Sequence, residues 1–282
     1  MKLPFSNSQL ALRVISALVA IGFLYFSYYL LENTGIVLAS ALCIGLAIWE
    51  LSQLLFVHII SNRMLMWLFL FVCAILFPAA CFADGWEFSA LALGISVFSV
   101  TSLWLTREKI SAETLLRSLA LASLGFTYGV VFPSFAVKIL MHLQGIRWFV
   151  CMLALTFAGD TFSYFGGKIW GRSKLMPSLS PKKTIEGAFA GGLVAILAAI
   201  ILGRLTLPII PPWFMALAGL VTTFAAQSGD LFESLIKRVA HVKDSGSIMP
   251  GHGGMLDRLD GVYFAAPVFY AFLLWSEDLF YI

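Results

Sequence analysis

Residues 64–83, MLMWLFLFVCAILFPAACFA, form a run without a single charged side chain. A run of about 20 apolar residues is long enough to cross roughly 30 Å of hydrocarbon as an α-helix. The rest of the chain is similar, because 60% of its 282 residues are hydrophobic and only 12% are charged. Soluble domains carry about 25% charged residues. The sequence therefore predicts an integral membrane protein made of helices.

Comparable apolar runs recur along the whole chain, and we expect an all-α polytopic protein with about nine transmembrane helices. The predicted spans are 11–31, 36–58, 64–83, 88–106, 114–141, 147–169, 187–207, 212–236 and 259–280. The first has no clear small-x-small cleavage site before Glu32, so we expect an uncleaved helix and no signal peptide.

The positions of the 18 Lys and Arg residues predict the orientation, because cations beside short loops stay cytoplasmic. With a cytoplasmic N-terminus, only Lys138, Arg147 and Arg204 lie outside, and the other fifteen lie inside. The net charge of +3 reflects these loops and gives no indication of nucleic acid as a partner.

The chain divides into two parts of unequal content. Residues 1–145 are predicted to hold about five helices and short loops, and residues 146–282 a catalytic region whose site faces the cytoplasm. Glu50 is the acidic residue deep in a span of the first part. A carboxylate inside a membrane is a functional candidate, but Ser52 and Gln53 follow it, which favours a solvated or helix-paired carboxylate.

Three polar segments stand out in the second part. In 159–187, Asp160, Tyr164 and Lys168 are four residues apart and share one helix face. Thr184 is predicted to be the N-cap of the next helix, with Glu186 in its first turn. Gly166, Gly167, Gly171 and the GAFAG of 187–191 indicate close packing of backbones, and Arg172, Lys174, Lys182 and Lys183 add positive charge.

The second segment is 227–238, where Gln227, Asp230, Glu233, Ser234 and Lys237 form one polar stripe at helical spacing. The third is KDSGSIMPGHGGMLDRLDG at 243–261. Its aspartates 257 and 260 open the last helix, where the helix dipole favours negative charge. Gly251, Gly253 and Gly254 around His252 indicate a backbone that turns tightly.

Carboxylates, cations and exposed backbone amides are the groups that phosphate chemistry on a metal ion requires. Mg²⁺ needs only one or two carboxylates in addition to substrate phosphates and water. Phosphoryl transfer depends mainly on positioning and charge neutralisation. A site at the cytoplasmic ends of these helices would let a soluble polyphosphate reach a lipid headgroup.

The run from Ser234 to Asp260, SLIKRVAHVKDSGSIMPGHGGMLDRLD, resembles the signature of the phosphatidate cytidylyltransferases, also called CDP-diacylglycerol synthases. The Ser-x-x-Lys-Arg start, the Lys-Asp pair, the Pro-Gly-His-Gly-Gly turn and the Asp-Arg-x-Asp end stand at that family's spacing. SPKKTIEG at 180–187 and GDLFES at 229–234 resemble its other blocks. The match covers about 100 residues of the C-terminal half.

The resemblance implies a nucleotidyltransferase of phospholipid biosynthesis that converts CTP and phosphatidate to CDP-diacylglycerol and pyrophosphate. It implies that the enzyme requires Mg²⁺ and leaves open whether a second, monovalent cation also binds. It further implies a multi-pass protein of a bacterial-type cytoplasmic (inner) membrane and leaves open whether the protein is a homodimer. The predicted metal ligands are Asp230, Asp257, Asp260 and Asp244. The predicted catalytic groups also include Lys237, Arg258 and His252, and the predicted phosphate-binding groups are Lys168, Arg172, Lys182, Lys183, Gly253 and Gly254. His252 is a proton donor or a turn residue that bonds to backbone.

Three alternatives differ in chemistry. A CTP-dependent polyprenol or phytol kinase would use similar groups to transfer the γ-phosphoryl group. An ion-coupled transporter would use Glu50, Asp160 and Asp230 as an intramembrane relay, but the charges gather in loops on one side. A CDP-alcohol phosphotransferase would carry an Asp-Gly-x-x-Ala-Arg pattern, which this sequence lacks.

Overall fold

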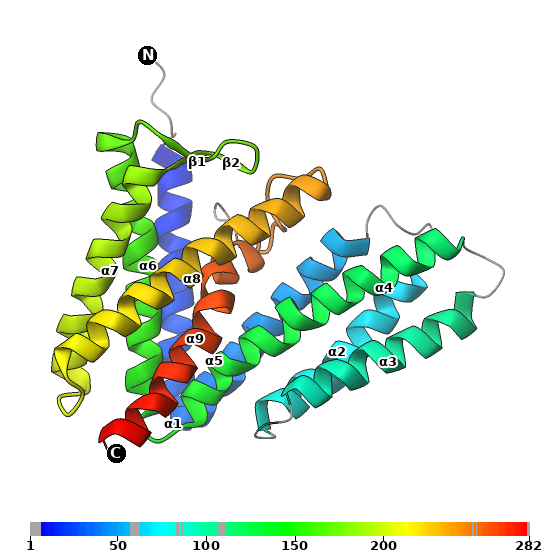
Figure 1. The fold of residues 1–282 in the computed structure, drawn as a ribbon, viewed down its shortest axis with the longest axis horizontal. Helices are drawn as coiled ribbons and strands as arrows, with labels where there is room; N and C mark the ends of the chain where they lie inside the picture. Colours follow the sequence, from blue (N-terminus) through cyan, green and yellow to red (C-terminus); the bar gives the residue numbers. More distant parts are fainter. Residues whose placement is uncertain are drawn as a thin grey trace. The chain divides into compact units, whose positions relative to one another are not determined.

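The computed structural model describes residues 7–56, 63–82, 85, 87–106, 111–249, 251 and 253–280. Nearly all of them are helical (Figure 1). In chain order the elements are α1 (Asn7–Phe56), α2 (Met64–Phe82), α3 (Glu87–Thr106), α4 (Ala112–Phe126), the π-helical turn Thr127–Val131, α5 (Phe132–Met141), α6 (Gly145–Trp170), β1 (Lys174–Met176), β2 (Ser180–Thr184), α7 (Ile185–Thr206), α8 (Pro212–Val239) and α9 (Leu256–Phe280).

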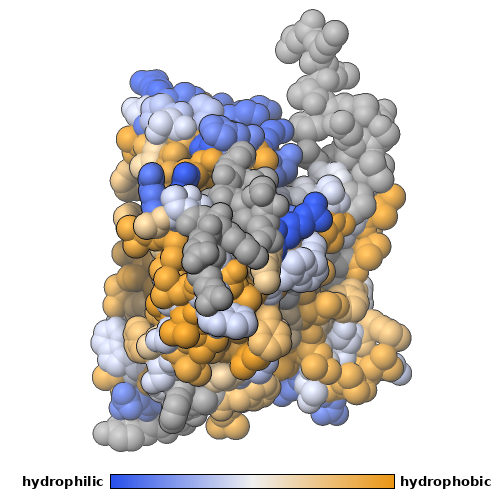
Figure 2. All heavy atoms as spheres, turned by 90° about the vertical axis from the view of Figure 1, so that its right-hand side faces the viewer, coloured by the Kyte–Doolittle hydropathy of each residue, from blue (hydrophilic) through white to orange (hydrophobic). Residues whose placement is uncertain are grey.

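Seven helical stretches of the described chain are long and apolar enough to cross a membrane. The visible face in Figure 2 is mostly hydrophobic, as expected for helices in contact with lipid. The all-α polytopic class is therefore confirmed, while the count of nine and the cytoplasmic N-terminus stay predictions.

Two predicted spans account for the difference in number. The span 11–31 and residues 36–56 of the next span fall in α1, whose helical path is interrupted at Glu32 (φ 52°, ψ −134°). The span 212–236 falls in α8, which is not among the seven because its second half carries the polar stripe that begins at Gln227. Local composition thus marks the helices correctly but does not fix where each one crosses.

Contacts divide the chain into two compact units, residues 1–130 with 240–259 and residues 131–239 with 260–282. The predicted functional division near residue 145 is a different boundary and stays a prediction. The first unit has an aromatic core formed by one buried phenylalanine from each of α1 to α4. Phe69 stacks on Phe126 with ring centroids 5.0 Å apart, and Phe56 and Phe98 complete the cluster.

The second unit is organised by close contact between α6 and α7. Gly187 and Gly191 of α7 lie against backbone of α6, since a Cβ at Gly187 would come within 2.9 Å of Gly167 N. This confirms that the glycines of 187–191 serve helix packing. Small residues let membrane helices approach closely, where dispersion and weak polar contacts hold them.

A short antiparallel hairpin, β1–β2, joins α6 to α7 and was not expected from the sequence (Figure 1). Thr184 ends the hairpin and caps α7, because its hydroxyl accepts a hydrogen bond from Gly187 N (3.2 Å). Glu186 in the first turn accepts backbone N–H groups of Arg172 (3.0 Å) and Ser173 (3.1 Å). The predicted cap is confirmed, and Glu186 in addition holds the start of the hairpin.

Candidate active site

An open pocket lies in the second unit between the C-terminal half of α6, the hairpin and α8, with about 860 Å³ of empty space that is partly open to solvent. We call it the lysine pocket. Its polar lining consists of Asp160, Ser163, Tyr164, Lys168, Lys182, Lys183, Thr184, Gln227 and Asp230. Three lysines and two aspartates in one pocket suit a polyphosphate accompanied by a cation.

The helical spacing of α6 explains one wall of this pocket. Asp160, Tyr164 and Lys168 are four residues apart, and all three line it, as predicted. Tyr164 is 62% exposed.

Two contacts hold α8 against the opposite walls. Lys183 of β2 forms an ion pair with Asp230 of α8, and each side chain is 27% exposed. Gln227, one turn earlier, donates from Nε2 to Ala188 O of α7 at 3.1 Å. The hairpin cation and the predicted metal ligand are thereby brought together across 47 residues of sequence.

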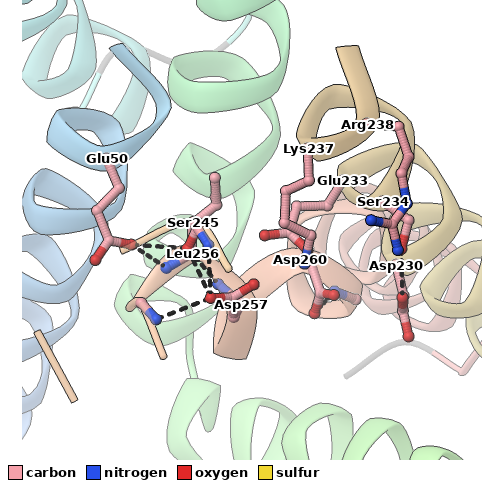
Figure 3. Close-up of polar contacts among 12 residues, drawn as sticks. Glu50, Asp230, Glu233, Ser234, Lys237, Arg238, Ser245, Leu256, Asp257 and Asp260 are labelled. Atoms are coloured by element: carbon pink, nitrogen blue, oxygen red, sulfur yellow. Dashed lines mark hydrogen bonds and ion pairs between the residues drawn. The ribbon is translucent and has the colours of Figure 1, made fainter. Parts of the chain in front are cut away.

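Other members of the polar stripe on α8 point toward partners within the second unit. Glu233 is fully buried and forms an ion pair with Lys237, whose side chain is 14% exposed (Figure 3). Ser234 donates to Asp230 at 3.5 Å. Asp260 of α9 lies within electrostatic range of Asp160, Asp230 and Glu233, and its Oδ1 accepts from Gly261 N at 2.7 Å. Lys237 therefore has a structural partner in addition to its predicted role.

The described residues from Lys243 to Met255 precede α9 in the first unit, and two of them are tied to Asp257 by hydrogen bonds. Oδ2 of Asp257 accepts hydrogen bonds from Ser245 N (2.9 Å), Ser245 Oγ (2.9 Å) and Gly254 N (2.8 Å) (Figure 3). Gly251 and Gly253 have positive φ angles of 77° and 89°, which residues with a side chain rarely adopt. The predicted tight turn is confirmed at these two glycines.

Two backbone N–H groups that were predicted to contact phosphate, those of Gly253 and Gly254, form hydrogen bonds within the first unit. Gly253 N donates to Met249 O (3.1 Å) and Gly254 N donates to Asp257. Their contact with a phosphate stays a prediction.

The predicted site residues thus fall into separate groups. Lys168, Lys182, Lys183 and Asp230 share the lysine pocket, and Arg172 lies on the exposed surface at the start of the hairpin. Asp244, Asp257 and Arg258 belong to the first unit, and Asp260 belongs to the second. His252 lies outside the described residues.

Ser245 is a candidate that sequence reasoning missed, and for Glu50 the helix-paired alternative fits the structure while the solvated one does not. Glu50 is only 3% exposed, so it is not solvated. Its Oε2 accepts from Ser245 Oγ (3.1 Å) and Leu256 N (2.9 Å). The only sequence signal for Ser245 is a small polar residue between an aspartate and a glycine, a pattern common in loops.

The residues present fit magnesium in chemistry. Among the described residues, no group of three or more His, Cys, Asp or Glu side chains is arranged to hold a metal ion. Mg²⁺ does not require such a cage, because it takes one or two carboxylates and completes its shell with water and phosphate oxygens. Asp260, which lies within electrostatic range of Asp160 and Asp230 in the second unit, supplies that kind of donor together with them.

The chain is similar to known proteins along most of its length. The model of the cytidylyltransferase family matches residues 11–276. The chain is 44% identical over 122 residues to the uncharacterized protein YnbB of Escherichia coli K12, and the aligned region covers 43% of this chain and 41% of that protein. It is 36% identical over 179 residues to phosphatidate cytidylyltransferase of Staphylococcus epidermidis (63% and 65%) and 43% identical over 131 residues to that of Bacillus subtilis (46% and 48%).

These alignments span about half the length of the curated relatives. The family model, in contrast, reaches from the first predicted span to the last turns of α9. It includes the hairpin, the lysine pocket and the loop held by Asp257. The chain therefore belongs to the cytidylyltransferase family.

Proposed function

We propose that the chain is a phosphatidate cytidylyltransferase, which transfers the cytidylyl group of CTP to phosphatidate and releases pyrophosphate. The observation that carries the proposal is the lysine pocket, which three lysines and two aspartates line. Family membership and relatives that bear this name support the choice of reaction.

In the proposed reaction, a phosphate oxygen of phosphatidate attacks the α-phosphorus of CTP. The new bond joins that oxygen to the α-phosphorus, and the bond from the α-phosphorus to the bridging oxygen breaks, so pyrophosphate leaves with the electron pair. Phosphatidate is already anionic at neutral pH, and no strong general base is needed. The main obstacle is repulsion between two anions, which cationic side chains reduce.

Lys168, Lys182 and Lys183 are the groups that we propose for this neutralisation. They come from both ends of the α6–hairpin segment, so a triphosphate in the pocket would have cations on more than one side. Lys183 is oriented by its ion pair with Asp230. We assign lysines to phosphate oxygens without dividing them between the nucleotide and the lipid.

Asp230 and Asp260, both in the second unit, are the residues that we propose to hold Mg²⁺. Asp257 stays a predicted ligand. When bound, the ion would neutralise the triphosphate and stabilise the departing pyrophosphate. Asp244 stays a predicted ligand. We also propose that the pocket faces the cytoplasm of a bacterial cell, because fifteen of eighteen cations fall on that side of the predicted topology.

One assay tests the function directly. Purified protein in detergent is incubated with phosphatidate and CTP labelled in the cytidine ring, with and without Mg²⁺. We expect a labelled lipid and free pyrophosphate only when metal and phosphatidate are both present. A lipid labelled from γ-phosphate CTP, without cytidine, would instead identify a CTP-dependent lipid kinase and overturn the proposal.

A further inference from the structure

Glu50 of α1 is buried in an apolar part of the first unit. It is 3% exposed, and its neighbours on the helix, Ala47, Ile48 and Leu51, are 0%, 6% and 0% exposed. A carboxylate in such surroundings is costly unless polar groups compensate it. Its position therefore calls for partners from elsewhere in the chain.

Those partners come from the loop and helix that carry Asp257. Oε2 of Glu50 accepts the N–H of Leu256, the first residue of α9, at 2.9 Å. The first N–H groups of a helix have no partner within the helix, and a carboxylate there also interacts favourably with the helix dipole. Glu50 thus caps α9 from a separate helix, 206 residues away in sequence.

Ser245 connects this cap to Asp257. Its hydroxyl lies 3.1 Å from Glu50 Oε2 and 2.9 Å from Asp257 Oδ2, and it accepts from Asp257 N at 3.2 Å (Figure 3). Asp257 Oδ2 also accepts from Ser245 N and Gly254 N. The N–H groups of Ser245 and Gly254 donate to one oxygen and fix the direction of the carboxylate group. The single hydrogen of the Ser245 hydroxyl has acceptors in both Asp257 Oδ2 and Glu50 Oε2, so this hydroxyl links the two carboxylates.

Two glycines make room for this arrangement. A Cβ on Gly246 would lie 2.6 Å from Cδ of Glu50, and a Cβ on Gly254 would lie 2.7 Å from Gly246 N and in collision with the Glu50 carboxylate. Neither is among the glycines with positive φ. The absence of a side chain at both positions is therefore explained by the approach of Glu50 and not by backbone conformation.

The other oxygen of Glu50, Oε1, has no hydrogen-bond partner among the residues that the structure describes. A buried polar atom left unsatisfied costs about 1–3 kcal/mol. An apolar residue at this position would avoid that cost but would leave the N–H of Leu256 without its acceptor, so the role of the carboxylate lies in the hydrogen bonds that Oε2 accepts.

We propose that Glu50 is a positioning residue, which fixes Asp257 through Ser245 and the first turn of α9. This deepens the proposed function and rests on it, because Asp257 is a predicted ligand of the ion in that reaction. Helix α1 then contributes to catalysis by holding Ser245 and the first residue of α9.

The test compares Ser245→Ala, Glu50→Ala and Glu50→Gln with the wild type. Ser245→Ala removes only a hydroxyl, and we expect kcat for cytidylyl transfer to fall about 10- to 100-fold, the range seen when a residue behind a metal ligand is lost. KM for CTP should change little, since the lysine pocket is untouched. Glu50→Gln keeps a carbonyl acceptor and should lose less than Glu50→Ala.

Ser52→Ala is the matched control. Ser52 is also a fully buried polar residue of α1, but its hydroxyl donates to Trp49 O of the same helix at 2.7 Å. This variant should keep wild-type activity, which separates loss of the loop anchor from general disturbance of α1.

Hydrogen–deuterium exchange gives a readout that does not depend on activity. In Ser245→Ala and Glu50→Gln we expect faster exchange at 245–257 and unchanged exchange across α6 and the hairpin. Unchanged exchange at 245–257 in both variants would overturn the proposal, as would an equal increase along the whole chain. If the wild type makes no cytidine lipid, the proposed function fails, and the exchange experiment still decides whether Glu50 holds the loop.

Discussion

Replacing Gly187 by alanine should separate α6 from α7 and thereby distort the lysine pocket. A Cβ at this position would lie 2.5 Å from Ser163 O and 2.9 Å from Gly167 N. Ordinary contacts of a Cβ begin near 3.4 Å, so the helices must move apart by about 0.5–0.9 Å. Both neighbours are backbone atoms, and a change of rotamer cannot relieve the collision.

The cost follows from the size of this shift. Overpacking of a close-packed contact destabilises by about 1–3 kcal/mol. Asp160, Tyr164 and Lys168 lie on the helix that must move, and a misplacement of about 1 Å in a site can reduce activity about 100-fold. We therefore expect a lower unfolding temperature in detergent and a fall in kcat/KM for CTP of about 10- to 100-fold.

Gly192→Ala provides a control with the same chemical change in the same helix. A Cβ there would meet nothing within 4 Å, and alanine is favoured over glycine in a helix by about 0.5–1 kcal/mol. This variant should be as stable as the wild type or slightly more stable, with normal activity. Equal thermal stability of Gly187→Ala and Gly192→Ala would refute the reasoning, whatever reaction the protein catalyses.

Three further predictions concern single contacts of the second unit. Lys183→Met removes a pocket cation and the partner of Asp230, so kcat/KM for CTP should fall about 10- to 100-fold. The control Lys174→Met changes a lysine of β1 outside the pocket lining and should resemble the wild type. Equal losses of kcat/KM in the two variants would contradict a specific role of Lys183. Thr184→Val removes the cap of α7 and should cost about 1 kcal/mol in a denaturation experiment, with Thr184→Ser unaffected. Lys237→Met removes the cationic partner of the fully buried Glu233 and should destabilise the protein by about 3–5 kcal/mol. Adding Glu233→Gln should restore much of the lost stability in thermal unfolding. If activity also returns in the double variant, Lys237 is structural and does not bind phosphate.

Several features could be predicted from the sequence because short-range physics determines them. Runs such as 64–83 are apolar over a length that spans a bilayer, so their helical state follows from composition. Thr184 and Gly253 act within three or four residues of themselves, as a cap and a left-handed turn. The spacing of Asp160 and Lys168 similarly placed them on one wall of the pocket.

Other features depend on which distant segments meet. The hairpin of β1 and β2 is short and rich in lysine, and contacts with α6 and α7, including the hold of Glu186 on Ser173, position it. The sequence around Glu50 does not predict that Ser245 and Leu256, 195 and 206 residues away, are its hydrogen-bond donors. The burial of Glu50 and the identity of its donors are properties of packing.

By itself, the sequence determined the membrane class, the helices and the kinds of chemical group available for phosphate and metal, because hydropathy, periodicity and residue type are local quantities. Tertiary structure alone decided which groups share a pocket and which support one another. It brought Lys183 into an ion pair with Asp230 and Glu50 into hydrogen-bonding distance of Ser245, which also contacts Asp257. The physical reason is that a charged side chain in an apolar protein is stable only with partners, and only folding brings those partners within hydrogen-bonding distance.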